Sequence, residues 1–175
     1  MRAIPLTVTA LAAALLLTAC NGGGSKSSAT SGTSGKNSSA CEIGRVSVQI
    51  GSASVAPGVG DTGEIPVSLT NQSAPCTLDD FAGVVLGAGG TEAKVPALKG
   101  AKAQKLKLNK GDSATFTITY VRGKAGDKTG LDAKTVKITL PGTSASHDFP
   151  WSYGPVAEQG GAPNASVSAF QQVGD

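Results

Sequence analysis

The sequence predicts an all-β protein, an antiparallel immunoglobulin-like β-sandwich of about 7–8 strands that follows a disordered Gly/Ser linker. Three observations support this fold class. Apolar and polar residues alternate with a period of two through most of the chain after residue 45. Turn-forming Gly, Pro and Asn residues separate the alternating runs at nearly regular spacing. No segment after the N-terminal apolar run shows the apolar spacing of a helix.

The first 19 residues have the pattern of a secretory signal peptide. Met1-Arg2 carries a single positive charge, and an apolar run follows that ends at Leu17. This run holds roughly 15 apolar residues, whereas a membrane-spanning helix needs about 20. A charged start, a short apolar middle and small residues before a cleavage site favour a signal peptide at residues 1–19 over an uncleaved N-terminal anchor.

Cys20 follows this run directly. The segment Leu17-Thr18-Ala19-Cys20 resembles a bacterial lipobox, with a branched apolar residue, two small residues and then cysteine. The resemblance implies cleavage before Cys20 and a diacylglycerol group on its sulfur, and two acyl chains give a stable anchor. We therefore expect a lipoprotein at the extracytoplasmic face of the bacterial cell membrane, with the membrane as its partner through the diacylglyceryl group.

Residues 20–40 are expected to form a flexible tether. Residues 21–40 include seven Ser, five Gly, two Thr and two Lys, and no apolar residue larger than Ala. Such a segment buries too little apolar surface to offset its conformational entropy. A Gly/Ser chain of about 20 residues spans roughly 25 Å root-mean-square, which would hold a domain away from the bilayer.

The cysteine count predicts one disulfide. Three cysteines are present, and Cys20 is assigned to the lipid. Disulfides persist in exported proteins, so we expect Cys41 and Cys76 to pair. A closed loop of about 35 residues would contribute about 3–4 kcal/mol in the chain-entropy picture. The competing interpretation, a metal or redox site, lacks a Cys-x-x-Cys spacing.

The β-sandwich domain is expected to span residues 41–156, with strands wherever apolar and polar residues alternate. The expected strands are 45–50, 64–70, 84–86, 91–95, 105–108, 114–121, 135–140 and 149–156. Pro66 indicates a sheet edge for the second strand, because proline lacks a ladder donor.

Connections between the expected strands follow from their turn residues. Gly89-Gly90 predicts a hairpin, and residues 109–112 predict a turn before the strand at 114–121. Residues 122–133 read as a Gly/Lys/Asp loop. Residues 157–175 are expected to be a C-terminal tail that is extended or loosely docked.

Three segments carry a resemblance to a known family. They are Cys41 at the start of a strand, Val67-Ser68-Leu69-Thr70-Asn71-Gln72-Ser73 leading into Cys76-Thr77-Leu78, and Leu108-Asn109-Lys110-Gly111-Asp112-Ser113-Ala114. Together they resemble the secreted domain of unknown function 4232, over roughly residues 41–153. The resemblance implies an exported protein or lipoprotein of high-GC Gram-positive bacteria. It implies no activity, because the family has none established.

The sequence offers no catalytic constellation, so we expect a protein that is not an enzyme. His147 is the only histidine and is expected in a loop, where its neighbours Ser146 and Asp148 would not converge on it. An enzyme acting on envelope glycan would need a carboxylate pair, and Asp79 and Asp80 keep that alternative open. An inhibitor of a secreted hydrolase, presented by the loop at 122–133, is the other alternative.

No cofactor, metal or nucleic acid is expected as a ligand. Copper favours Met, His and Cys ligands, but Met1 lies in the signal peptide and both remaining cysteines are paired. A calcium site stays open without the spacing of a known loop, and its acids would be Asp79, Asp80, Asp127 or Asp132. A net charge of +3 is too small to indicate nucleic-acid binding.

A lysine-rich stretch is the first candidate surface. Six lysines lie between Glu92 and Asp112 with no acid among them: Lys94, Lys99, Lys102, Lys105, Lys107 and Lys110. Lys105 and Lys107 would share one face of a strand. Such an edge resists sheet-to-sheet aggregation. Alternatively, it attracts anionic wall polymers or lipid headgroups, which makes Lys105 and Lys107 candidate ligand-binding residues.

An aromatic segment is the second candidate surface. Phe149, Trp151 and Tyr153 alternate and would share one face of an extended strand. The chain has few aromatic residues, so we expect these three to contribute to the core. If they are exposed, they form a stacking platform for sugar rings and are candidate ligand-binding residues.

These patterns predict a non-catalytic, lipid-anchored protein of the cell envelope. Its β-sandwich would bind or organise an extracytoplasmic partner, either a wall polymer or an exported protein. This expectation combines the membrane location implied by the lipobox resemblance at Cys20 with the absence of a catalytic motif in the sequence.

Overall fold

The computed structural model describes residues 39–53 and 56–174. The predicted signal peptide, Cys20 and the tether up to residue 38 lie outside these residues. The described part contains β-strands and no helix, and hence no helix able to cross a membrane. The strands are β1 (Val46–Ile50), β2 (Thr62–Asn71), β3 (Cys76–Asp79), β4 (Gly83–Ala88), β5 (Thr91–Val95), β6 (Lys105–Leu108), β7 (Ser113–Val121), β8 (Gly130–Leu131), β9 (Thr135–Thr139), β10 (Ser146–Pro150), β11 (Val156–Gln159), β12 (Ala162–Pro163), β13 (Ala165–Val167) and β14 (Gln171–Gln172).

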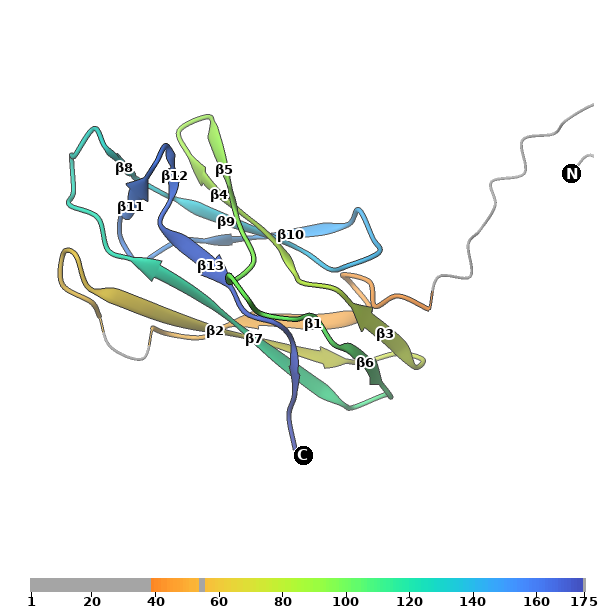
Figure 1. Ribbon diagram of the computed structural model, residues 1–175. Helices are drawn as coiled ribbons and strands as arrows, with labels where there is room; N and C mark the ends of the chain where they lie inside the picture. The colour runs from red at the N-terminus through yellow and green to blue at the C-terminus, as the bar shows by residue number, and fades with distance from the viewer. Residues whose placement is uncertain (1–38, 54–55, 175) are drawn as a thin grey trace, which may run out of the picture. The chain divides into compact units, whose positions relative to one another are not determined.

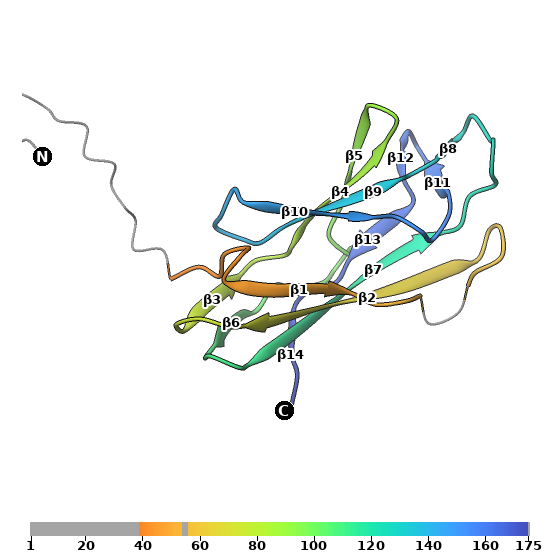
Figure 2. The same ribbon diagram turned by 180° about the vertical axis from the view of Figure 1, so that it is seen from behind.

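Two antiparallel sheets face each other as the layers of a sandwich (Figures 1 and 2). One has the order β1-β2-β7-β13, with β14 also paired to β7, and the other has the order β10-β9-β4-β5. Two smaller sheets, β12-β11-β8 and β3-β6, complete the domain. The predicted antiparallel immunoglobulin-like sandwich is confirmed, but the described residues form 14 strands rather than the expected 7–8, because short strands such as β8 and β12 leave no visible alternation in the sequence.

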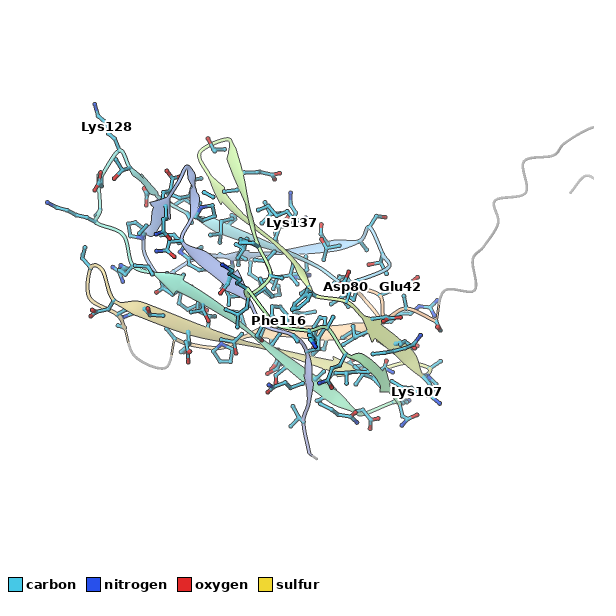
Figure 3. The ribbon with its side chains drawn as sticks, viewed as in Figure 1. Glu42, Asp80, Lys107, Phe116, Lys128 and Lys137 are labelled. Carbon is cyan, nitrogen blue, oxygen red and sulfur yellow. A yellow bond between two sulfur atoms is a disulfide. The ribbon has the colours of Figure 1, made fainter. Side chains whose placement is uncertain are left out.

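The period of two determines which side chains form the core. In the longest pairing, β2 with β7, Ile65 lies opposite Ile118 and Val67 opposite Phe116, and all four are buried. Phe116 lies between the layers in Figure 3. Across the sandwich, Val84 of β4 pairs with Ile138 of β9, and both are fully buried. The residues that alternate with the buried ones, such as Thr117 of β7 and Lys137 of β9, are only partly buried, as the alternation predicted.

The hairpin predicted at Gly89-Gly90 is confirmed between β4 and β5. Both glycines have positive φ values, 53° and 95°. A two-residue hairpin turn of this kind needs left-handed backbone at both positions, which glycine adopts without steric cost.

Pro66 does not lie at a sheet edge, so that expectation was wrong. It occupies β2, which pairs with both β1 and β7. The carbonyl of Pro66 accepts a hydrogen bond from Gly51 N–H at 2.8 Å, just beyond the last residue of β1. The missing N–H of Pro66 faces the same side, so one of the two ladder bonds with Gly51 is absent, and the Gly51 carbonyl accepts a hydrogen bond from the Tyr153 hydroxyl instead.

The sequence predicted that the domain ends at residue 156, but the domain continues beyond it. The segment after it supplies most of β11 and all of β12, β13 and β14, and the last two pair with β7. Val167 and Phe170 are buried, and the Phe170 ring contacts Phe116 edge-on at a centroid distance of 5.3 Å. These strands are too short for a period of two to be visible in the sequence.

The Cys41–Cys76 disulfide is confirmed, with a Cα–Cα distance of 4.9 Å. It joins the first described residues to β3, and Ala40 forms an isolated bridge with Thr77 beside it. β3 pairs on its other side with β6. The strands β6 and β7 flank the turn at 109–112, but they do not pair with each other.

Candidate functional site

The three aromatic side chains predicted to share one face take different positions. Trp151 is buried, and its Nε1 donates to the Gly154 carbonyl at 2.6 Å. Phe149 and Tyr153 are only partly buried. The strand β10 ends at Pro150, so the alternation of an extended chain does not continue through residues 151–153. The expected burial is therefore confirmed for Trp151, whereas no platform of three rings exists.

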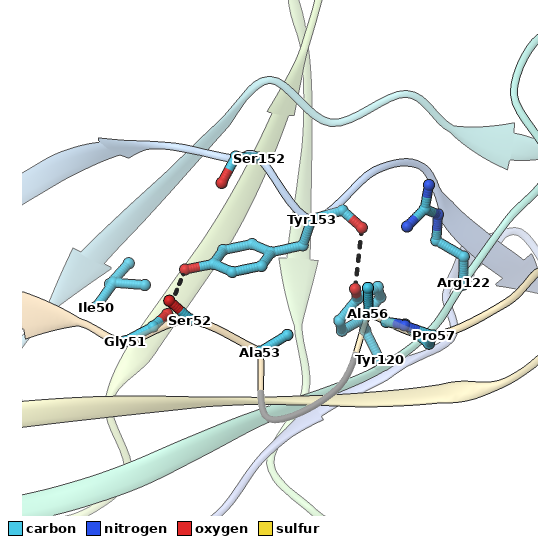
Figure 4. Close-up of a pocket in the computed structure, with 10 residues that line it drawn as sticks. All are labelled: Ile50, Gly51, Ser52, Ala53, Ala56, Pro57, Tyr120, Arg122, Ser152 and Tyr153. Atoms are coloured by element: carbon cyan, nitrogen blue, oxygen red, sulfur yellow. Dashed lines mark hydrogen bonds between the residues drawn. The ribbon is translucent and has the colours of Figure 1, made fainter.

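Tyr153 connects the two sheets at the open side of the sandwich. Its hydroxyl donates to the Gly51 carbonyl at 2.6 Å, immediately after β1. Its own carbonyl accepts a hydrogen bond of 2.9 Å from the Tyr120 hydroxyl, at the end of β7 (Figure 4). The Tyr153 ring also contacts Trp151 edge-on at 5.0 Å between centroids. Tyr153 is thus held at three points, two on its side chain and one on its backbone carbonyl.

Two adjoining cavities lie beside the edge strands β1 and β10 and the segments that follow them, and we refer to them together as the edge groove. The first has a volume of about 340 Å³ and includes Arg122, Tyr120, Ser52 and Pro57 in its lining (Figure 4). The second has a volume of about 510 Å³ and includes Val48, Gln49 and Phe149 in its lining. Ile50, Ser152 and Tyr153 line both cavities.

Arg122 is the one charged side chain among the described residues that line the edge groove. Its guanidinium lies directly over Gly154: a Cβ built there would be 2.4 Å from Arg122 Cζ. Its Nε is buried, and it has no hydrogen-bond partner in the described part of the chain. No carboxylate of the described residues forms a salt bridge with Arg122.

The two tyrosines of the edge groove remain protonated donors at neutral pH. Burial raises the pKa of Tyr120, and the positive charge and hydrogen bond of Arg122 only partly oppose that effect. Burial likewise raises the pKa of Tyr153. The groove therefore combines half-buried aromatic rings, hydroxyl groups and one cation, which is the composition of a binding site for a polar ligand with apolar faces.

The lysine strand lies apart from this groove. Lys105 forms a salt bridge with Asp79 at 3.2 Å, and both side chains are about two-thirds exposed, so the pair adds little stability. Lys107 is exposed opposite Thr77 and points away from the layers (Figure 3). β6 pairs with β3 alone, which agrees with a charged edge strand that resists aggregation.

The acids and the histidine do not converge. His147 lies in the edge strand β10 rather than in a loop, exposed and with its ring 4.4 Å from that of Phe149. It belongs to the strand because it pairs in register with Ile138. Among the described residues, His, Cys, Asp and Glu form no group of three or more that could hold a metal ion.

Sequence reasoning missed two residues of structural importance. Asn71 is the one polar side chain in the buried core of the described residues, and its Nδ2 donates to the carbonyls of Ala74 and Leu108. For Arg122, the sequence predicts only a position at the start of a loop. The sequence signal for Arg122 was weak. Arg122 follows the longest alternating strand and precedes a glycine, and neither feature indicates that the fold places Gly154 beside it.

Comparison with known proteins identifies the family of this chain. No curated protein and no solved structure shows significant similarity to the chain. The model of one family, the domain of unknown function DUF4232, matches residues 41–171. The match begins at the first disulfide cysteine and ends in β14, so it includes the C-terminal strands. Since it covers most of the chain, the protein belongs to the DUF4232 family.

Proposed function

We propose that this protein is a non-catalytic, lipid-anchored binding protein of the cell envelope, and that its extracytoplasmic ligand occupies the edge groove. The single observation that supports the binding role is the groove itself, where Phe149 and Tyr153 leave part of their rings accessible beside exposed serine hydroxyls. Aromatic faces combined with hydroxyl donors suit sugar rings, which have both apolar and hydroxyl-bearing surfaces.

A wall polymer fits this site better than a folded protein does. The groove is concave and the two cavities adjoin along the edge strands, so successive units of a chain could lie beside Phe149 and Tyr153. An exported protein would be expected to use a flatter, larger surface. The lipobox supports the location, because a tether of about 20 residues would hold the groove within reach of envelope polymers.

The lipid anchor is tested by labelling. Cells that express the full chain are fed radiolabelled palmitate, and the label and the membrane fraction are followed. We expect the native chain to be labelled and membrane-bound, and Cys20→Ser to lose both properties. An unlabelled native chain in the medium would remove the anchor from the proposal.

Ligand binding is tested by filling the groove. Ser152 is exposed and lines both cavities, so Ser152→Trp should obstruct them without altering the core. Ser144→Trp, at an exposed position in the turn before β10, is the matched control. Isothermal titration with purified cell-wall polysaccharide should show at least about tenfold weaker binding for Ser152→Trp and no change for Ser144→Trp. Equal affinities would place the ligand elsewhere, and no binding by the native protein would reject the wall polymer.

A further inference from the structure

We infer that the edge groove recognises an oxyanion, a carboxylate or phosphate group borne by a saccharide or polyol chain, and that Arg122 is its anchor. This inference rests on the proposed function, because it concerns the same groove, but it makes a narrower claim about the ligand's charge. Two observations support it: the backbone and guanidinium of Arg122 are held in place, and no carboxylate of the described residues pairs with that guanidinium.

The backbone of Arg122 is fixed from both sides. Its N–H donates to the Asp61 carbonyl at 2.8 Å, and its own carbonyl accepts from Gly60 N–H at 2.8 Å. Arg122 also forms an antiparallel bridge with Val156. The backbone that carries this side chain is therefore ordered before any ligand arrives, so it loses little conformational entropy on binding.

The guanidinium is also fixed in space. Gly154 has a φ of +84° and leaves the volume that the Arg122 side chain occupies, since Nε and one terminal nitrogen would each be within 2.6 Å of a Cβ at that position. Tyr120 contacts the same guanidinium and lies opposite Gly63, where a Cβ would be 2.5 Å from the Tyr120 ring. Two glycines therefore make room for the Arg122–Tyr120 pair.

The charge of Arg122 is not neutralised within the described part of the chain. Arg45, the other arginine of the domain, has Glu42 at 3.5 Å, whereas Arg122 has no carboxylate within salt-bridge distance. The nearest acid along its backbone contacts is Asp61, whose carboxylate accepts a hydrogen bond from Gly58 N–H at 3.2 Å. A partly buried guanidinium with an unsatisfied Nε is costly to leave unpaired.

An oxyanion supplies what this site lacks. Guanidinium binds carboxylate and phosphate through parallel N–H donors, and such charge-assisted bonds are stronger than neutral ones. Tyr153 and Ser152 lie next to Arg122 in the same lining, so a ring carrying the anion could contact the aromatic face and a hydroxyl. A neutral sugar would use the rings and hydroxyls but leave the cation unmatched.

The test uses the arginine side chains as reporters. Arg2 lies in the expected signal peptide, so the chain from residue 20 onward has two arginines, Arg45 and Arg122, and its ¹⁵N spectrum should show two Nε–Hε signals. Trigalacturonic acid, a glycerol-phosphate oligomer and neutral galactotriose are titrated separately. We expect one or both anionic probes to shift the Arg122 signal and leave Arg45 unchanged, with galactotriose shifting neither. The two anionic probes distinguish carboxylate from phosphate.

Variants then separate charge from fold. Arg122→Gln should weaken binding of the anionic probe roughly 10- to 100-fold, as expected for the loss of charge-assisted hydrogen bonds. Arg45→Gln removes the same charge outside the groove and should bind as the native protein does. Arg122→Lys keeps the charge but loses the planar pair of donors, so intermediate affinity is expected. Urea unfolding of each variant shows whether the fold is retained.

The outcomes distinguish this inference from the proposed function. Wall-polymer binding that is blocked by Ser152→Trp but unaffected by Arg122→Gln would overturn the anion anchor and leave the groove as the site. An unchanged Arg122 signal with both anionic probes would also overturn it. A shift of Arg122 by these probes, without any binding of wall polysaccharide, would support the oxyanion site and reject the wall polymer.

Discussion

Tyr153 and Gly51, which are separated by 102 residues in the chain, are joined by a hydrogen bond of 2.6 Å from the tyrosine hydroxyl to the glycine carbonyl. Gly51 follows β1 at the edge of one sheet, and Tyr153 follows β10 at the edge of the other. This contact crosses the open side of the sandwich, and Tyr153 lines both cavities of the edge groove. The shape of both cavities therefore depends in part on how this side chain is held.

Tyr153→Phe should lower the free energy of unfolding by about 1 kcal/mol, because one hydrogen bond is lost and the ring is retained. Urea unfolding monitored by Trp151 fluorescence measures this change. The matched control is Tyr120→Phe, which removes the neighbouring hydroxyl bond to the Tyr153 carbonyl and leaves the Gly51 contact intact. If Tyr153→Phe were as stable as the native protein, the bond to Gly51 would not hold the sheets together.

Alkaline pH should destabilise the domain through its tyrosines. Burial raises the pKa of both Tyr120 and Tyr153. The folded state therefore retains these protons to higher pH than the unfolded state, whose tyrosines titrate near pH 10. The contribution of these tyrosines to the free energy of unfolding is fully present below about pH 10 and is lost as the pH rises through the folded-state pKa values.

Tyr120→Phe/Tyr153→Phe tests this explanation, in urea unfolding between about pH 8.5 and 11. The decline with pH should become shallower in the double variant but not disappear. Lys137 remains, and its pKa is raised by the hydrogen bond to and the charge of Glu92, so its contribution has the same sign. An identical slope in the native protein and the double variant would contradict the role of the tyrosines.

Removal of the disulfide should cost about 3–4 kcal/mol, since the bond closes a loop of about 35 residues. Cys41→Ser/Cys76→Ser is compared with the native chain in urea, with and without a thiol reductant. Reductant should destabilise the native chain to the level of the double variant and leave that variant unchanged. Cys20→Ser, which lies outside the described residues, should have the native response to reductant.

Asn71→Ala should destabilise the fold by about 2–3 kcal/mol, because it leaves buried carbonyls without donors. The Asn71 amide donates to Ala74 O and Leu108 O at 3.0 Å each, and its oxygen accepts from Ser73 N–H. Asn71→Asp should be at least as harmful, since a carboxylate cannot donate to these carbonyls. Gln72→Ala, at the exposed neighbour, is the control, and a comparable loss there would argue against a special role for Asn71.

Gly154→Ala should both destabilise the domain and displace Arg122. The new Cβ would clash with the guanidinium, in addition to the strain of a φ of +84°. Gly160→Ala is the matched control, because it has a φ of +64° but open space around it. The difference in unfolding free energy between the two variants measures the clash, and anion affinity should fall only for Gly154→Ala. Equal effects would mean that backbone strain alone is responsible.

Much of the fold could be predicted from the sequence because its longer strands each bury one face. The alternation at Val46–Ile50, Ile65–Leu69 and Ala114–Tyr120 predicted which side chains lie in the core, and Gly89-Gly90 predicted its hairpin. The disulfide followed from the number of cysteines. The strand faces, the hairpin and the disulfide depend on local periodicity, on turn residues and on the number of cysteines, so they can be predicted from a single sequence.

The sequence by itself determined the all-β class, most strand positions and the Cys41–Cys76 pair, since side-chain period and turn residues act locally. The tertiary structure alone decided the partners that close the fold: β6 pairs with β3, β13 and β14 pair with β7, and Pro66 lies opposite Gly51, one residue after β1. It also decided that Tyr153 lies beside Gly51 and Arg122 beside Gly154. Such contacts join residues far apart in the chain. No local sequence pattern indicates which distant backbone segment will leave space for the Tyr153 or Arg122 side chain.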